Sequence, residues 1–199
     1  EYEDIHLPLH GPHQARNAAT ALAAVEAFFG AGPGRPLNID AVREGFATVA
    51  SPGRLERGRS APTVFIDAAH NPHGTRALRE ALTAEFEFRK VVGVVAVLGD
   101  KDARGILEEL EPYVEELVVT QNASPRALHV DDLAELAEQV FGEERIHRIE
   151  TLPSAIELAI APAEETDSGD GIVSGSGVVV TGSVVTAGEA RTLFGKDPQ

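Results

Sequence analysis

The chain has 199 residues, 43% of them hydrophobic and 25% charged, which is ordinary for one globular core with at most a small addition. Its formal net charge of −15 leaves little basic surface, so nucleic acid and anionic membranes are poor partners. The absence of cysteine excludes disulfides and thiolate metal sites. No apolar run is long enough to cross a bilayer. We expect a cytoplasmic protein.

The first fifty residues indicate two helices rather than an alternation of strands and helices. Apolar residues recur at helical spacing over 13–30, and a glycine-rich loop follows. A second, shorter helix is predicted over 38–50, with Asp40 as its N-cap. We therefore expect residues 1–50 to form a separate helical part that ends at a hinge near residue 51.

From residue 63 onward, buried strands alternate with helices. The polar stretch 51–62 before them indicates an exposed loop or a strand with a turn, and the acidic, Gly/Ser-rich stretch 164–177 indicates a mobile loop. Strand 145–150 is the most polar and is expected near an edge. Strands are predicted at 63–68, 90–99, 116–121, 145–150 and 178–183, and helices at 72–87, 102–113, 131–141, 153–164 and 186–195. This alternation predicts an α/β fold with a mostly parallel sheet covered by helices on both faces.

Polar residues follow the strands where each one ends. In a parallel sheet these ends share one edge, where ligands bind. Lysine and arginine there can receive carboxylates or phosphates, and an aspartate can accept from ribose hydroxyls or an ammonium group. The residues expected together at this edge are Asp67, His70, Asn71, His73, Lys101, Asn122, Arg126 and Ser183.

Each of these residues also has a simpler interpretation. Asp67 is equally well explained as a residue that turns the chain before a helix. One of His70 and His73 is expected to bond to local backbone. We do not expect the pair to bind a metal, because no third ligand is evident beside them. Ser183 can belong to a tight turn, and Arg54 to a solvated loop. Only the convergence of many polar strand ends favours a binding site.

Several short motifs occur in the order found in one known group of enzymes. The motifs are "GPHQARNAATALAA" (11–24), "SPGRLE" (51–56), "IDAAHNP" (66–72), "LGDKD" (98–102), "SPRA" (124–127) and "VTGS" (180–183). In this combination the chain resembles the C-terminal part of the folylpolyglutamate and dihydrofolate synthases of the Mur ligase superfamily. The resemblance implies a Rossmann-like glutamate ligase domain at 51–199, with 1–50 as the helical tail of a central ATP-binding domain.

The resemblance also implies a reaction. ATP phosphorylates the carboxylate of a folate or dihydropteroate, and the amino group of L-glutamate attacks the acyl phosphate. The resemblance implies that a preceding P-loop domain holds Mg²⁺ and the nucleotide phosphates. This sequence contains neither a P-loop nor a starting methionine, so we expect it to be an inactive piece of a longer enzyme. The implied roles are ATP contacts for Asn17, Arg54 and Asp67, a place beside the transferred phosphate and glutamate for His70, and the glutamate carboxylates for Lys101 and Ser183.

Three other interpretations stay open at this point. A peptidoglycan-type Mur ligase would share the architecture, although "GRLE" with "DAAHNP" favours the folate branch. A nucleotide- or amino-acid-binding module without catalysis belongs to a different class, and an acidic interaction domain is the weakest alternative. We expect the whole protein to be monomeric and this chain to self-associate, because apolar surface around 1–50 would be left uncovered.

Overall fold

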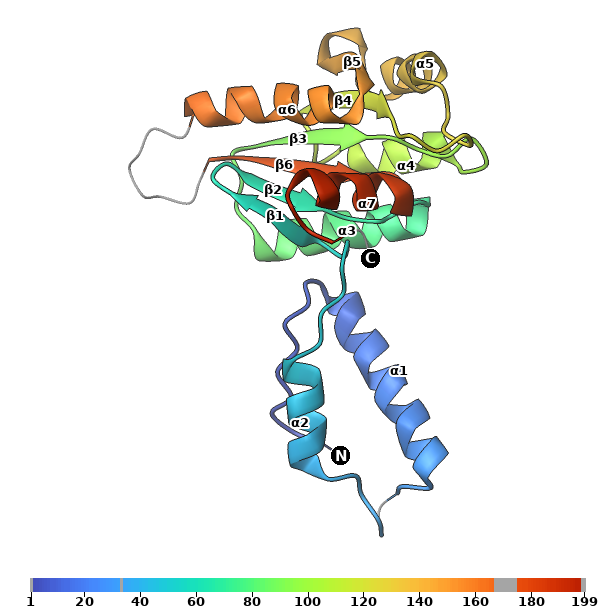
Figure 1. Cartoon of the computed structure of the whole chain (residues 1–199), viewed down its shortest axis with the longest axis vertical. Helices are drawn as coiled ribbons and strands as arrows, with labels where there is room; N and C mark the ends of the chain where they lie inside the picture. The colour runs from blue at the N-terminus through green and yellow to red at the C-terminus, as the bar shows by residue number, and fades with distance from the viewer. Residues whose placement is uncertain (1, 33, 167–174, 198–199) are drawn as a thin grey trace. The chain divides into compact units, whose positions relative to one another are not determined.

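A computed structural model describes the chain except for residues 1, 33, 167–174 and 198–199 (Figure 1). The chain divides into two compact units, Glu1–Ser51 and Pro52–Gln199. Most of the stretch 164–177, predicted to be mobile, lies outside the described residues. Its last two residues, Ser176 and Gly177, belong to a strand instead. Within the part of the chain that is described, no helix is long and apolar enough to cross a membrane.

The second unit is built on a six-stranded sheet with the order β1-β2-β6-β3-β4-β5. Every neighbouring pair is parallel except β1 and β2, which are antiparallel. The predicted α/β fold with a mostly parallel sheet is confirmed, and the polar strand β5 lies at an edge as expected. The strands are β1 (Glu56–Ser60), β2 (Thr63–Ile66), β3 (Lys90–Val95), β4 (Glu116–Gln121), β5 (Ile146–Thr151) and β6 (Ser176–Thr181).

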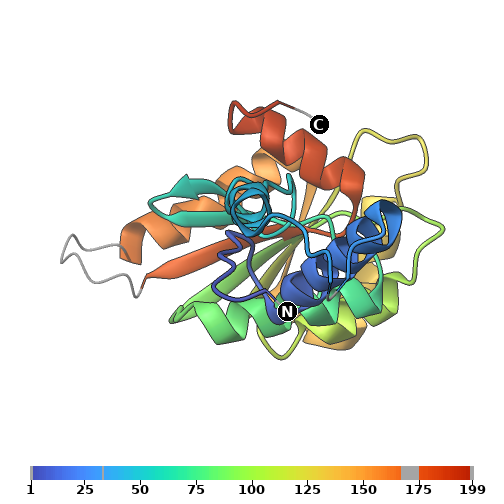
Figure 2. The same cartoon turned by 90° about the horizontal axis from the view of Figure 1, so that it is seen from below.

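Helices cover both faces of this sheet (Figure 2). Successive strand residues point to opposite faces, so Phe65 packs with one set of helices, whereas Val64 and Ile66 pack with the other. One face holds α3 (Pro72–Glu85), α4 (Ala103–Leu110) and α5 (Val130–Phe141), with the short helix η1 (Glu143–Arg145) after α5; the opposite face holds α6 (Leu152–Thr166) and α7 (Val184–Leu193). The β-branched runs therefore form strands because both of their faces are buried.

Three strands end earlier than predicted. β2 ends at Ile66 rather than 68. β3 ends at Val95 rather than 99, because the following residues leave the ladder and Leu98 pairs with Ala127 in the loop after β4. β6 ends at Thr181, because Ser183 is the N-cap of α7 and accepts from the amide of Thr186. At the end of β3 the chain changes partner before its apolar run ends.

The turn between β6 and α7 requires glycine. Gly182 has φ +111°, and its amide donates to the carbonyl of Ala69 at 3.1 Å. A Cβ atom added there would lie 2.6 Å from the carbonyl oxygen of Ala96, which belongs to the neighbouring backbone. Gly182 thus permits the close approach of three chain segments at the carboxyl edge of the sheet.

The first unit consists of α1 (Pro12–Phe29), α2 (Ile39–Ala47) and an extended N-terminal segment. The prediction of Asp40 as N-cap was wrong: the Asn38 side chain accepts from the amide of Ala41, so Asp40 lies in the first turn. Asparagine is as good a cap as aspartate, and it stands before the first helical residue, Ile39. The predicted helices at 13–30 and 38–50 are otherwise present.

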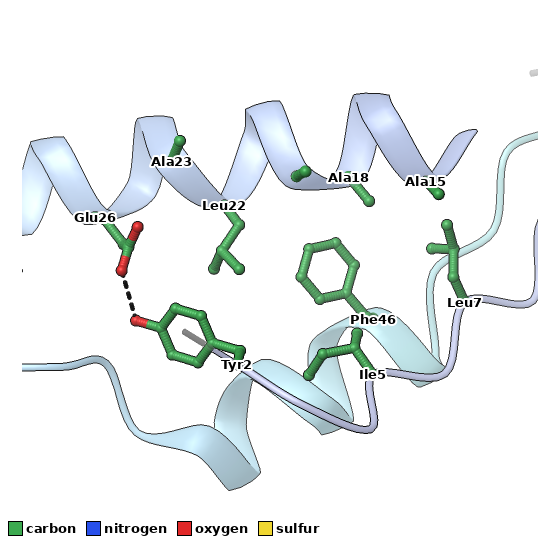
Figure 3. A pocket seen from close by; sticks show the side chains of 10 residues that line it. Tyr2, Ile5, Leu7, Ala15, Ala18, Leu22, Ala23, Glu26 and Phe46 are labelled. Atoms are coloured by element: carbon green, nitrogen blue, oxygen red, sulfur yellow. Dashed lines mark hydrogen bonds between the residues drawn. The ribbon is translucent and has the colours of Figure 1, made fainter. Parts of the chain in front are cut away.

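This unit has a thin core. A cavity of about 340 Å³ lies between α1, α2 and the N-terminal segment. Figure 3 shows Leu22 and Phe46 among its lining side chains. The Tyr2 hydroxyl donates to Glu26 Oε1 at 2.7 Å beside it. On α1, Phe28 is 83% exposed and Phe29 is 60% exposed. Two adjacent exposed aromatic rings leave an apolar surface that other protein can cover.

We predict that the chain of residues 1–199 self-associates as its concentration rises. Burial of Phe28 and Phe29 between copies would remove apolar area from water. Sedimentation velocity should show a shift toward larger species, and replacing both phenylalanines with serine should reverse it. Val184→Ser, which removes an equally exposed apolar side chain from α7, should leave the shift unchanged. A concentration-independent monomer would contradict this expectation.

We predict that Gly182→Ala destabilises the second unit by about 2 kcal/mol or more, because the new Cβ meets backbone and the positive φ disfavours alanine. Urea unfolding followed by circular dichroism measures this change. Gly188→Ala is the matched control, because Gly188 lies within α7 with open space around its Cβ position. That variant should be more stable than the original by about 0.5–1 kcal/mol. Equal effects of the two substitutions would show that the turn tolerates a side chain.

Candidate functional site

The candidate site is the edge of the sheet where β2, β6 and β3 end. These strands are adjacent and parallel, so their C-terminal extensions meet. The amide of Asp67 donates to the carbonyl of Val180 at 2.9 Å, and that of Ala96 donates to Thr181 at 3.3 Å. The predicted convergence of the segments around 67–70, 99–102 and 181–183 on one edge is confirmed.

Asp67 holds two pieces of backbone together at this edge. Its Oδ1 accepts from the amide of Ala69 and its Oδ2 from the amide of Leu55, each at 2.8 Å. The residue is only 7% exposed, and this burial raises the pKa of its carboxyl against the opposing effect of the two amides. Asp67 therefore turns the chain, as its simpler interpretation supposed, and a contact with ribose stays a prediction.

Arg54 lies on a tight turn fixed by that carboxylate. Gly53 and Leu55 on either side of it both have positive φ, +65° and +47°. The carbonyl of Gly53 accepts from the amide of Ala68 at 2.7 Å, and the side chain of Leu55 is buried. Arg54 itself is exposed. The turn thus places an exposed guanidinium next to the end of β2, where it can meet an anion.

His70 is the histidine of this corner that bonds to local backbone. Its Nδ1 lies 3.0 Å from the carbonyl oxygen of Ala68, and a carbonyl can only accept. Neutral His70 therefore carries its proton on Nδ1 and keeps a lone pair on Nε2. The ring is half-buried, whereas His73 on the first turn of α3 is exposed. An imidazole held in this tautomer is able to accept a proton at Nε2.

Lys101 belongs to a cluster with Asp100 and Arg126. Asp100 lies 3.1 Å from Lys101 Nζ and 2.7 Å from an amino group of Arg126. Lys101 first, and Arg126 with it, hold the pKa of Asp100 below its usual range. The loop after β4 brings Arg126 here, because the amide of Gly99 donates to the carbonyl of Arg126 at 2.8 Å. Two cations thus share one acid at the edge.

Ser183 lies in a buried polar network below the surface of the edge. Its hydroxyl is 2.8 Å from that of Thr186, and Asn122 Nδ2 donates to both, at 3.2 and 3.0 Å. Thr186 in turn donates to the carbonyl of Ala96 at 2.9 Å. Ser183 is 1% exposed. The network joins the ends of β3, β4 and β6, and a contact of Ser183 with glutamate stays a prediction.

Two further predictions concern residues or ions away from this network. Asn17 lies exposed on α1 in the first unit, with its amide 3.5 Å from Gln14 Oε1, and its contact with ATP stays a prediction. Among the described residues, no group of three or more histidine, aspartate or glutamate side chains gathers in a way that could hold a metal ion.

Three residues at this edge escaped the sequence reasoning. Thr186 links the polar network, and Glu56 and Arg191 form an ion pair at 2.7 Å beside the Arg54 turn. Glu56 stands within the "SPGRLE" motif, so the motif was a usable signal. Arg191 and Thr186 lie on a helix far along the chain, and no local pattern marks them.

Comparisons with known proteins give a consistent result. The family model for the Mur ligase, glutamate ligase domain, matches residues 53–183. Over its whole length the chain is 61% identical to the dihydrofolate synthase/folylpolyglutamate synthase of Mycobacterium tuberculosis, and it spans 42% of that protein. The chain therefore covers less than half of this relative.

Solved structures agree. A structure of Mycobacterium tuberculosis folylpolyglutamate synthase complexed with ADP and AMPPCP matches all of the chain with a TM-score of 0.92 and 58% identity, over 43% of its own length. Escherichia coli FolC in complex with DHPP and ADP matches 96% of the chain with a TM-score of 0.76 and 29% identity, over 40% of its length. The chain belongs to the Mur ligase family, because the model of that family's glutamate ligase domain matches more than half of it, residues 53–183.

Proposed function

We propose that this chain acts as the glutamate ligase domain of an ATP-dependent enzyme that joins L-glutamate to the carboxylate of a folate or dihydropteroate. One observation carries the proposal: the chain is 61% identical, over its whole length, to a dihydrofolate synthase/folylpolyglutamate synthase. The edge of the sheet supports it, because that edge combines exposed cations with a histidine of defined tautomer. The cytoplasm stays our prediction for where the enzyme acts.

The proposed chemistry requires activation of a poor electrophile. A carboxylate accepts an amine only after its oxygen becomes a good leaving group, and phosphorylation by ATP supplies that group. The amine of glutamate then forms the amide bond, and inorganic phosphate leaves. Negative charge gathers on the phosphoryl group during this sequence, so cations held in place nearby lower the barrier.

His70 is the proposed proton acceptor. The incoming glutamate carries an ammonium group, which must lose a proton before it can attack. His70 Nε2 has a lone pair because Nδ1 donates to Ala68, and a neighbouring imidazole is able to take up that proton. Lys101 and Ser183 are proposed to contact the glutamate carboxylates; Lys101 is the more accessible of the two.

Arg54, Asp67 and Asn17 are proposed to serve the nucleotide. Arg54 is exposed and positively charged, which suits the phosphates of ATP. Asp67 would contact the ribose, and it also holds the turn that carries Arg54 through the amide of Leu55. The ligands of Mg²⁺ are proposed to lie outside this chain, as the resemblance implies, and we derive no step from the metal here.

The experiment that tests this function uses the whole gene product that encodes the chain. We expect ATP-dependent release of phosphate that requires both L-glutamate and either dihydropteroate or tetrahydrofolate, with the glutamylated product identified by mass spectrometry. A peptidoglycan precursor in place of the folate should give no product. Turnover only with the peptidoglycan precursor, or with no acceptor at all, would contradict the folate assignment.

We predict that His70→Gln lowers kcat by about 10²–10³-fold, because glutamine cannot accept the proton from the glutamate ammonium group. Steady-state kinetics with the whole gene product measure this change. His73→Gln is the matched control: it removes the exposed imidazole three residues away and should leave kcat within about twofold. Equal losses in the two variants would indicate that His70 has no special part in proton transfer.

A further inference from the structure

The turn that carries Arg54 is held from a second side, by Glu56 at the start of β1. Glu56 Oε2 accepts from the amide of Gly53 at 2.8 Å and from Arg191 Nε at 2.7 Å. Its other oxygen, Oε1, lies 3.1 Å from Lys196 Nζ. A single carboxylate thus ties the turn to the C-terminal helix α7 and to the residues just beyond it.

Arg191 is a buried anchor on α7. The residue is 7% exposed, and besides Glu56 its guanidinium donates to the backbone carbonyl of Asp197. The turn packs directly on this helix, because a Cβ atom at Gly53 would lie 3.5 Å from that of Ala187. An arginine buried without its acid would be costly, so the pair is part of the unit's packing.

The turn needs such support because its backbone is strained. Leu55 has φ +47°, a left-handed conformation that is unfavourable for a residue with a Cβ atom. Asp67 fixes the amide of Leu55, and Glu56 fixes the amide of Gly53. The two carboxylates therefore hold the residues immediately before and after Arg54.

The contacts of Glu56 favour the ionised form of its carboxyl. Burial alone would raise the pKa of its carboxyl, but the Gly53 amide, Arg191 and Lys196 together hold it below the usual value. We call the contacts of Glu56 with Gly53, Arg191 and Lys196 the clamp; the ionised carboxylate is the form that accepts all three.

We propose that Glu56 and Arg191 are positioning residues that fix the Arg54 guanidinium for the phosphates of ATP. The inference rests on the proposed function, since it assigns the nucleotide to Arg54. Neither residue touches the ligand: Glu56 fixes the turn, and Arg191 fixes Glu56. Without this clamp Arg54 would still carry its charge, but the turn would sample more conformations, and each contact with phosphate would cost more ordering entropy.

The test measures ATP affinity by calorimetry with the whole gene product, alongside the kinetics of ligation. Glu56→Ala should weaken ATP binding about tenfold, and Arg54→Ala at least as much. Glu56→Gln retains an oxygen that can accept from the Gly53 amide and Arg191, so it should stay within about threefold of the original. Combining Glu56→Ala with Arg54→Ala should weaken binding no further than Arg54→Ala alone.

Glu109→Ala is the matched control. Glu109 also joins two cationic side chains, Arg76 and Arg79, between α4 and α3, but it contacts no residue of the Arg54 turn. Glu109→Ala should lower the melting temperature about as much as Glu56→Ala does, while leaving ATP affinity unchanged. Arg191→Lys provides a second route: lysine keeps the charge but lacks the planar fork, and ATP binding should weaken without loss of the fold.

The outcomes separate this inference from the proposed function. Unchanged ATP affinity in Glu56→Ala would overturn the positioning role. So would a double variant in which the loss of affinity from Glu56→Ala adds in full to that from Arg54→Ala. An absence of folate ligation, together with the expected pattern of ATP affinities, would leave the clamp established and overturn only the folate assignment. If Arg54→Ala has no effect on ATP affinity, both the clamp's purpose and the nucleotide role of Arg54 are wrong.

Discussion

The carboxylate of Asp67 organises the edge of the sheet. It accepts from the amides of Leu55 and Ala69, so it joins the strained turn around Arg54 to the segment that leads from β2 into α3. His70 follows directly in that segment, and its ring is oriented by Ala68. The positions of a cation and an imidazole at this edge thus depend on one buried acid. The two amides it accepts from oppose part of the cost of its desolvation.

Polar residues at this edge divide into two groups. Buried ones such as Asn122, Ser183 and Thr186 satisfy each other and join strands β3, β4 and β6. More exposed ones such as Arg54 and Lys101 keep a cationic group accessible to solvent. A buried network of this kind favours one arrangement of the backbone, and that arrangement in turn determines where the accessible cations lie.

The strands and helices of the second unit could be predicted because their periodicity reflects burial. Runs rich in apolar and β-branched residues, such as 117–120, are buried on both faces, as expected for inner strands of a parallel sheet. The edge strand β1, "ERGRS", is polar and has no such pattern, and the sequence left it open as a loop or strand. The order of the strands has no local signal, since β6 pairs with β2 and β3 through contacts far apart in sequence. The same distance concealed Arg191, the partner of Glu56.

The place of β6 has a consequence for how the domain forms during synthesis. It is the last strand of the sheet along the chain, yet it lies in the middle and separates β2 from β3. Until residues 176–181 have left the ribosome, β2 and β3 lack the strand that pairs with both of them. The strand edges that β6 later covers stay unpaired. Such a topology delays cooperative folding of the sheet until β6 has been synthesised, and it makes protection of the nascent polypeptide against aggregation important.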